Sequence, residues 1–385
     1  MDIDYLAEAH RMSGELSALR RKFHREPELG NHEFKTAARI EHYLHELGIP
    51  TKRILETAVV GQLRGALPGP SLALRADMDA LPLQETTGVD FASKTPGVMH
   101  ACGHDVHITA LLGAARILAA HCEELAGTIL FLFQPDEEGN GGARRMIEAG
   151  VLEGVSAVFG AHVTPELPAG HIGVRYGKFY AASDTFRITV TGKSAHGAER
   201  EKGIDALAAA SKVVEELLEL QYHSSEKSVV TVGTFHAGTA GNIVADRAEL
   251  TGIIRTLGPE ARKQMRERVL ETVRSATGKF GAQAQCELHE SYPGVVNDDP
   301  MTQLVEGMAR SVLGTEHVHR IEEPLMMTED FGYFLQERPG AFYHIGAGCS
   351  LPLHNPGFLP NEEAIVTAAA VHAAVAVRGI STFAQ

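Results

Sequence analysis

Three apolar runs in this sequence each end at polar side chains of the kind that bind metals. The runs SLALRADMD, TILFLFQPDEE and VSAVFGAHV read as buried strands, and segments of helical periodicity separate them. Apolar strands that alternate with helices are typical of an α/β sheet covered by helices on both faces. Ligand sites in such folds lie at the carboxyl ends of the strands. We therefore expect these residues to meet at one edge of a sheet: Asp77, Asp79, Asp136, Glu137, Glu138 and His162.

The middle of the chain follows a different pattern. Alternating strand-like runs and two amphipathic helices succeed one another there in the order β-α-β-β-α-β, and the second helix carries Met265, Val269 and Val273 on one face. This order is typical of the ferredoxin-like split unit, and about 110 residues suffice for such a domain. We therefore predict a discontinuous catalytic domain of residues 1–178 and 291–385, interrupted by an α+β ferredoxin-like domain at 179–290.

Charge and composition exclude several classes of partner. The net charge is −14 and the sequence has no block of Lys and Arg, which argues against nucleic acid and anionic lipid as partners. No uninterrupted apolar run reaches the roughly 20 residues that span a bilayer. The N-terminus is acidic and lacks the apolar centre of a signal peptide, so we expect a cytoplasmic protein. Four cysteines in 385 residues do not make a disulfide framework.

Five residues stand out as candidate metal ligands. A thiolate, imidazoles and a carboxylate together suit zinc and other first-row divalent ions better than magnesium or calcium. Each residue alone has a simpler explanation, such as a small buried cysteine, a helix N-terminal histidine or a solvated loop residue. Most of them sit at strand ends or on a glycine-hinged turn, and this joint placement favours a metal site. The candidates are Cys102, His104, Glu138, His162 and His354.

Other histidines compete for this role. His100 and His104 are four residues apart, as in helical zinc motifs, but Gly103 lies between them and the sequence contains no HExxH. His107 could share the face of His104, whereas His344 lies inside an apolar run and reads as a core histidine. In PDEEG, one glutamate could bind metal while its neighbour takes a proton from water; the alternative is a solvated acidic turn.

Taken together, the motifs resemble a known family. The segments RADMDALP, MHACGHDVH, QPDEEGNGGARRMI, GAHV and HNPGFLPNEEA follow one another between residues 75 and 364. They resemble the dimetal amidohydrolases of the aminoacylase/carboxypeptidase superfamily, in the branch with indole-3-acetyl-amino-acid hydrolases, hippurate hydrolases and N-acetyl-amino-acid deacetylases. The resemblance implies that the five candidates bind two divalent ions, which could be manganese, zinc, nickel or cobalt. It also implies that Glu137 is the general base and Asp79 a supporting acid. Asp77 stands where the wider superfamily has a histidine and is not assigned as a ligand, and Glu329 and Asp330 match a pattern near the site.

The resemblance extends to the middle segment, which is similar to the family's lid and dimerisation domain. GKSAHGA implies that His196 stabilises an oxyanion, in its own or a partner subunit. GTAGNIVAD and IIRT imply that Asn242 and Arg255 grip the substrate carboxylate, and the alternative for Arg255 is a surface arginine in a strand. Many relatives have a proline after the histidine motif, whereas Glu199 and Arg200 stand here. The resemblance also implies a homodimer or higher homo-oligomer through this domain.

The implied activity is metal-dependent hydrolysis of N-acyl-L-amino acids, N-acetyl or hippurate-like, to a free amino acid and a carboxylic acid. One alternative is a metallo-dipeptidase or carboxypeptidase on short peptides. As a dipeptidase it would need an acidic pocket for a free α-amine, and the middle segment shows no obvious one. A different class of alternative is a non-catalytic protein that binds metal or amino acids. The presence of Glu137 favours an enzyme over that alternative.

Overall fold

An eight-stranded mixed sheet forms the centre of the larger part of this protein. The computed structural model describes residues 3–383, and the chain divides into two compact units, of which this is the first. This unit takes in the chain up to Gly177, Val296–Glu322 and the chain from Asp330 onward. Its four central strands run parallel to one another. The strands, in sheet order, are β1 (Thr51–Ile54), β2 (Ala58–Arg64), β4 (Ala126–Gln134), β3 (Leu67–Asp77), β5 (Val155–Thr164), β16 (Gly340–Gly346), β6 (Ile172–Val174) and β15 (Val318–Arg320).

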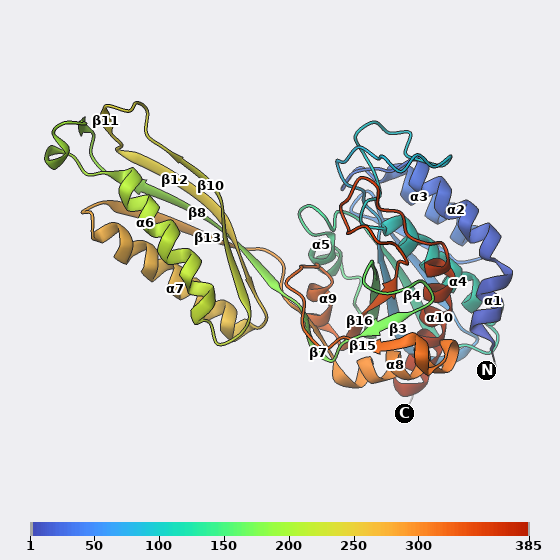
Figure 1. Cartoon of the computed structure of the whole chain (residues 1–385). Coiled ribbons are helices and arrows are strands. Elements are labelled where there is room, and N and C mark those ends of the chain that lie inside the picture. The colour runs from blue at the N-terminus through green and yellow to red at the C-terminus, as the bar shows by residue number, and fades with distance from the viewer. Residues whose placement is uncertain (1–2, 384–385) are drawn as a thin grey trace. The chain divides into compact units, whose positions relative to one another are not determined.

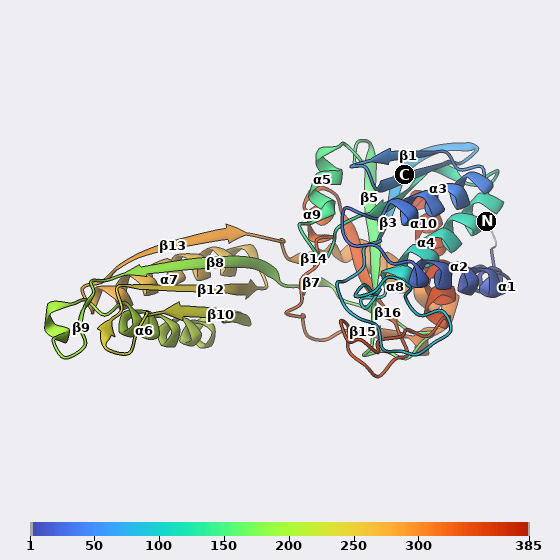
Figure 2. The same ribbon diagram turned by 90° about the horizontal axis from the view of Figure 1, so that it is seen from above.

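Helices cover both faces of this sheet (Figures 1 and 2). One face carries α1 (Tyr5–Arg11), α2 (Ser13–Arg25), α3 (Phe34–Glu46), α4 (His104–Ala120) and α10 (Glu363–Phe383), and the other carries α5 (Gly142–Glu148) and α9 (Gly332–Glu337). The helix α8 (Asp299–Leu313) packs beside α10. The α/β class predicted from the alternating runs is confirmed, because helices flank a mixed sheet whose central strands are parallel.

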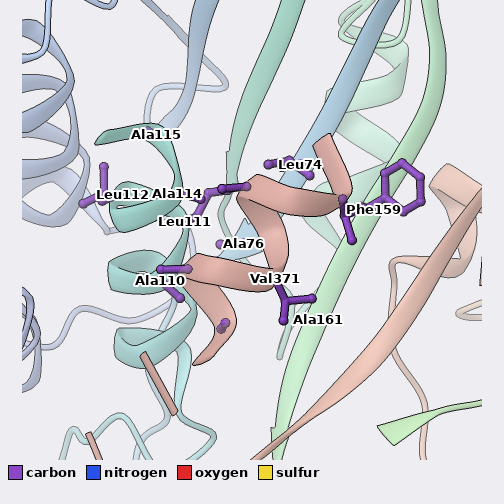
Figure 3. Packing of buried hydrophobic residues seen from close by; sticks show 14 of the residues in the cluster. Leu74, Ala76, Ala110, Leu111, Leu112, Ala114, Ala115, Phe159, Ala161 and Val371 are labelled. Carbon is purple, nitrogen blue, oxygen red and sulfur yellow. The ribbon is translucent and has the colours of Figure 1, made fainter. Parts of the chain in front are cut away.

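Small and branched apolar side chains fill the space between α4, α10 and the sheet. Figure 3 shows Leu111 and Ala114 of α4 and Val371 of α10 near Leu74 of β3 and Phe159 of β5. Among residues 3–383, α10 is the one helix long and apolar enough to cross a membrane, yet 83% of its most apolar 18-residue stretch is buried in the fold. Its apolar composition is therefore accounted for by its place in the core.

A four-stranded antiparallel sheet forms the second unit, Lys178–Val295 with Glu323–Glu329. Its elements follow the order β8, α6, β10, β12, α7, β13, and the strands lie in the order β10-β12-β8-β13, which is the ferredoxin-like arrangement. Both helices cover the same face, and Met265, Val269 and Val273 of α7 are buried against it. The bounds are β8 (Ala182–Thr191), α6 (Ala206–Glu219), β10 (Ser228–Ala237), β12 (Arg247–Thr256), α7 (Pro259–Gly278) and β13 (Gln283–Glu290).

Short elements complete the chain. Two-stranded ribbons pair β9 (Ala195–His196) with β11 (Ile243–Val244), and β7 (Gly177–Tyr180) with β14 (Val295–Asn297). Single 3-10 turns are formed by Arg200–Lys202, Leu220–His223 and Thr315–His317.

Candidate metal centre

Cys102 lies at the centre of a cluster of donor atoms. Its Sγ is 3.3 Å from Nε2 of His162 and 3.3 Å from Nε2 of His354. The same His354 nitrogen is 3.0 Å from Oε1 of Glu138. One donor atom each from Cys102, Glu138 and His354 lies within 4.8 Å of the others, and the same holds for His104, Glu137 and Glu138. All five predicted ligands therefore converge, although they come from four separate segments of the chain.

The backbone before α4 directs Cys102 and His104 into this cluster. Gly103 has a φ of 85°, and a Cβ at this position would lie 2.5 Å from Cγ2 of Val163. Both the left-handed conformation and the close approach require glycine. The turn thus places the thiol just before the helix and the imidazole in its first turn.

Two of the imidazoles are oriented by backbone carbonyls. Nδ1 of His104 donates to the carbonyl of Asp79 at 2.9 Å, and Nδ1 of His162 donates to the carbonyl of Val163 at 2.7 Å. These bonds leave Nε2 as the nitrogen with the free lone pair in each ring, which is how metal-binding histidines are held. Within residues 3–383, Nε2 of His104 is buried and has no hydrogen-bond partner. A buried nitrogen without a hydrogen-bond partner, close to the carboxylates of Glu137 and Glu138, fits a cation site.

The acidic turn after β4 is held from below by Asp79. Its Oδ1 accepts the backbone N–H of Glu137 at 3.1 Å, and its Oδ2 accepts that of Glu138 at 3.0 Å. Glu137 is buried, with 6% of its surface exposed. The turn is thus a fixed structure and not a solvated acidic loop. It points two neighbouring carboxylates at the same group of donors.

The electrostatics of the cluster favour positive charge. Burial acts to lower the pKa of His104, but Asp77, Asp79 and Glu138 raise it to about 10. Burial, together with Glu138 and Glu137, raises the pKa of the Cys102 thiol. Burial works against ionisation of Glu138, yet His354 and His104 hold its pKa below the usual value. Divalent ions would replace the protons that these groups otherwise retain.

His107, weighed as an alternative ligand, uses both ring nitrogens elsewhere. Its Nε2 accepts the backbone N–H of Val163 at 2.9 Å, so its Nδ1 carries the proton and donates to Asp77 at 2.6 Å. Asp77 also accepts from Arg75 at 2.7 Å. His107 and Asp77 therefore link α4 to the sheet beneath the cluster.

The two other histidines lie in the core. Burial lowers the pKa of His100 to about 3, and neither of its ring nitrogens has a hydrogen-bond partner in the described part of the chain. His344 lies in β16, paired with His162 across the sheet, and burial lowers its pKa to about 3 as well. Neither residue belongs to a group of three close donors among residues 3–383.

The sequence analysis placed Glu329 and Asp330 near the site but missed the buried network that joins Asp330 to Arg75 and Gln134. Arg75 donates to Oε1 of Gln134 and to Asp330, each at 2.8 Å. Asp330 also accepts from the Gln134 amide at 2.7 Å and from the backbone of Ala143 at 3.0 Å. Glu329, next to it in the chain, is buried. The signal available in the sequence was an arginine inside an otherwise apolar strand, which has to be paired when buried.

In the second unit, the structure brings His196 and Asn242 together. The carbonyl of Asn242 accepts the N–H of Gly197 at 2.8 Å, and His196 pairs with Ile243. Nδ1 of His196 accepts the N–H of Ala198 at 3.1 Å, so its Nε2 carries the proton and is a donor. Glu199 and Arg200, which depart from the family pattern, form exposed ion pairs with Lys202 and Asp205.

Arg255 lies toward the other end of this sheet. It pairs with Ser183, near the start of β8, whereas the ribbon with His196 follows the end of that strand at Thr191. Eight residues at about 3.3 Å each separate these two ends by roughly 26 Å. Among the described residues, Nη1 of Arg255 is buried without a hydrogen-bond partner, and burial lowers the pKa of the guanidinium. A half-buried arginine with one buried, unpaired nitrogen fits a ligand-binding residue better than a surface arginine.

Comparison with known proteins accords with this geometry. The sequence profile described as Peptidase family M20/M25/M40 matches residues 73–378. An N-acetylcysteine deacetylase of Bacillus subtilis is 38% identical over 94% of this chain and 96% of its own length. A thermostable carboxypeptidase of Saccharolobus solfataricus is 38% identical over 94% of each chain. The crystal structure of a dinuclear metal-binding M20 peptidase of Bacillus subtilis has a TM-score of 0.88 and 36% identity, over 97% of this chain and 99% of that one. The chain therefore belongs to peptidase family M20/M25/M40.

Proposed function

We propose that this protein is a metal-dependent amidohydrolase that cleaves N-acyl-L-amino acids into a carboxylic acid and a free amino acid. The observation that carries the proposal is the joint arrangement around Cys102. A thiol, oriented imidazoles and Glu138 would form a cation site, and Glu137 is held beside them on the same turn. The similarity to an N-acetylcysteine deacetylase supports N-acetyl amino acids as a substrate class.

Cys102, His104, Glu138, His162 and His354 would hold two divalent ions. Such ions supply Lewis acidity, which polarises the amide carbonyl and makes water more acidic. Glu137 takes the proton from the attacking water and returns it to the nitrogen of the leaving amine, which completes the cleavage. Because Asp79 fixes the backbone on which Glu137 sits, the base needs no reorganisation during the reaction.

Residues of the second unit would bind the rest of the substrate. Arg255 would pair with the free carboxylate of the amino acid, and its unpaired buried nitrogen supports this role. The Nε2–H of His196 would stabilise the oxyanion. Asn242, expected to grip the carboxylate together with Arg255, lies beside His196 and not beside Arg255 of the same protomer. A small substrate cannot span the roughly 26 Å of strand between Arg255 and His196. We therefore infer a homodimer, in which each substrate meets Arg255 of one protomer and His196 of its partner. A cytoplasmic location stays a prediction.

The test is hydrolysis of N-acetyl, N-benzoyl and indole-3-acetyl amino acids by metal-stripped protein, with manganese, zinc, nickel or cobalt added back. Metal-dependent release of free amino acid is the expected result. Glu137→Gln should bind metal and lose turnover by several orders of magnitude, because the proton acceptor is gone. Near-normal turnover by this variant would contradict the assignment of Glu137.

A second candidate is a metallo-carboxypeptidase, which the similarity to a thermostable carboxypeptidase favours. The same ions and base would serve, and Arg255 would bind the peptide's carboxylate. N-blocked and free dipeptides that share one C-terminal residue separate the two activities. Faster cleavage of both peptides than of any N-acyl amino acid would favour the peptidase. Absence of turnover with every metal and substrate would leave a binding protein.

A further inference from the structure

The loop between α2 and α3 contacts both turns that form the proposed catalytic site. The carbonyl of Glu28 accepts the backbone N–H of Ala80 at 2.8 Å, next to Asp79. Gly30 packs against the turn after β4 so closely that a Cβ there would lie 2.3 Å from Oδ1 of Asp136. The residues 28–33 are called the buttress loop below.

The buttress loop ends at Glu33, a buried acid whose side chain binds a backbone N–H of a distant turn. Glu33 occupies the N-cap position of α3, but within residues 3–383 its side chain makes no capping hydrogen bond to that helix. Its Oε1 instead accepts the backbone N–H of Asp136 at 3.0 Å. Glu33 is fully buried, and its Oε2 has no hydrogen-bond partner among the residues described. The side chain of Glu33 therefore does not cap α3 but binds the turn that carries Glu137.

The backbone that Glu33 binds at Asp136 has an unfavourable conformation. Asp136 has a φ of 57°, in the left-handed region that residues other than glycine rarely adopt. Its carboxylate accepts from Arg145 at 3.0 Å, which fixes the side chain on the outer side. Three consecutive backbone N–H groups, of residues 136, 137 and 138, are therefore received by the carboxylates of Glu33 and Asp79.

We propose that Glu33 is a positioning residue that holds the left-handed peptide at Asp136 and thereby aims the carboxylate of Glu137. The proposal rests on the amidohydrolase function inferred above and adds a residue that the reaction itself does not use. Burial, together with the charge of Asp79, raises the pKa of Glu33 to about 7. A glutamine would keep the acceptor oxygen for Asp136 without a charge, so Glu33→Gln is a suitable conservative variant.

The test compares Glu33→Ala and Glu33→Gln with Asp298→Ala as matched control. The carboxylate of Asp298 also accepts one backbone N–H, that of Met301 at 3.0 Å, at the start of α8. Glu33→Ala should lower kcat per metal-loaded protein by about 10- to 100-fold, the usual cost of losing such a supporting contact. KM should stay within about twofold, because the variant changes no group that binds substrate. Glu33→Gln should restore most of kcat, and Asp298→Ala should leave kcat unchanged.

Hydrogen–deuterium exchange at residues 135–141 gives a readout that needs no activity. Glu33→Ala should speed exchange there by at least about tenfold, whereas Asp298→Ala should not. Should Glu33→Ala fail to fold, Gly30→Ala perturbs the same turn from the other side and should show the same loss of kcat. Wild-type kcat and exchange in Glu33→Ala or Gly30→Ala would overturn the proposal, as would equal damage by Glu33→Gln. A wild-type protein without turnover would count against the amidohydrolase function, and the exchange rates would still decide the role of Glu33.

Discussion

Oδ1 of Asp79 accepts the backbone N–H of Glu137 at 3.1 Å, across 58 residues of sequence. The other oxygen of the same carboxylate accepts the N–H of Glu138. One acid, two residues after the end of β3, therefore fixes both glutamates of the turn after β4. The first prediction follows from this dependence.

Replacing Asp79 by asparagine should lower both turnover and metal affinity. The amide keeps one acceptor but presents an NH₂ group to the second backbone N–H, which leaves a buried donor unpaired. We expect kcat and metal affinity to fall by about 10- to 100-fold, measured by steady-state kinetics and metal titration. Asp298→Asn is the control, since asparagine caps a helix as well as aspartate does. Unchanged kcat in Asp79→Asn would show that the turn after β4 keeps its conformation without the carboxylate of Asp79.

Metal binding should release protons. At pH 7 the Cys102 thiol is protonated because burial raises its pKa, and His104, with a pKa of about 10, is protonated as well. Both must be deprotonated to bind a cation, so about two protons should leave and apparent affinity should rise between about pH 6 and 9. Calorimetric titration in two buffers of different ionisation enthalpy measures this number. His104→Asn should reduce it by about one, and a heat of binding independent of buffer would contradict the prediction.

The fold of the first unit was predictable because its signals are local. The length and periodicity of their apolar residues are enough to recognise β4 as a strand and α4 and α10 as helices. The strands β6 and β15 have three residues each and carry too little pattern to be recognised. Their place in the sheet is set by pairing with distant strands, which periodicity does not report.

The candidate ligands were predictable by residue type, but the division of roles among the histidines was not. His104 and His107 are three residues apart on one helix, so helical spacing alone does not separate a ligand from a supporting residue. What separates them is which ring nitrogen meets a carbonyl, a carboxylate or a backbone N–H. The contact of Glu33 with Asp136 spans 103 residues and has no local signature at all.

Gly113 should be intolerant of substitution, because α4 and α10 meet there. A Cβ at Gly113 would lie 2.9 Å from Cβ of Ala369 and 3.0 Å from Cδ1 of Leu16. Gly113→Ala should lower the free energy of unfolding by about 1–3 kcal/mol through overpacking, measured by urea denaturation. Gly307, inside α8, has nothing within 4 Å of such a Cβ among the residues described. Gly307→Ala should instead stabilise by about 0.5–1 kcal/mol, and a stabilised Gly113→Ala would show that the helices can move apart.

Glu306 should stabilise the fold in a pH-dependent way. Arg320 donates to both oxygens of its carboxylate at 2.9 Å, and Arg310 and Tyr176 donate as well. The hydrogen bonds from Arg320, followed by those from Tyr176 and Arg310, lower the pKa of Glu306 to about 2. A carboxyl whose pKa is lower in the folded state stabilises the fold above its unfolded pKa of about 4.3. That contribution is lost as the pH falls from there toward 2.

The pH dependence of Glu306→Gln tests this contribution. At pH 7 the variant should lose about 1–2 kcal/mol of stability, the range for hydrogen bonds to a charged group in a partly exposed setting. Thermal unfolding of both proteins at several pH values should show the difference in Tm shrinking below about pH 4. Glu148→Gln is the matched control, because Glu148 pairs with Arg144 on an exposed helix surface and should contribute under about 0.5 kcal/mol. If the Tm difference between Glu306→Gln and the wild type stays constant down to pH 3, the charge of Glu306 does not contribute to stability and the prediction is wrong.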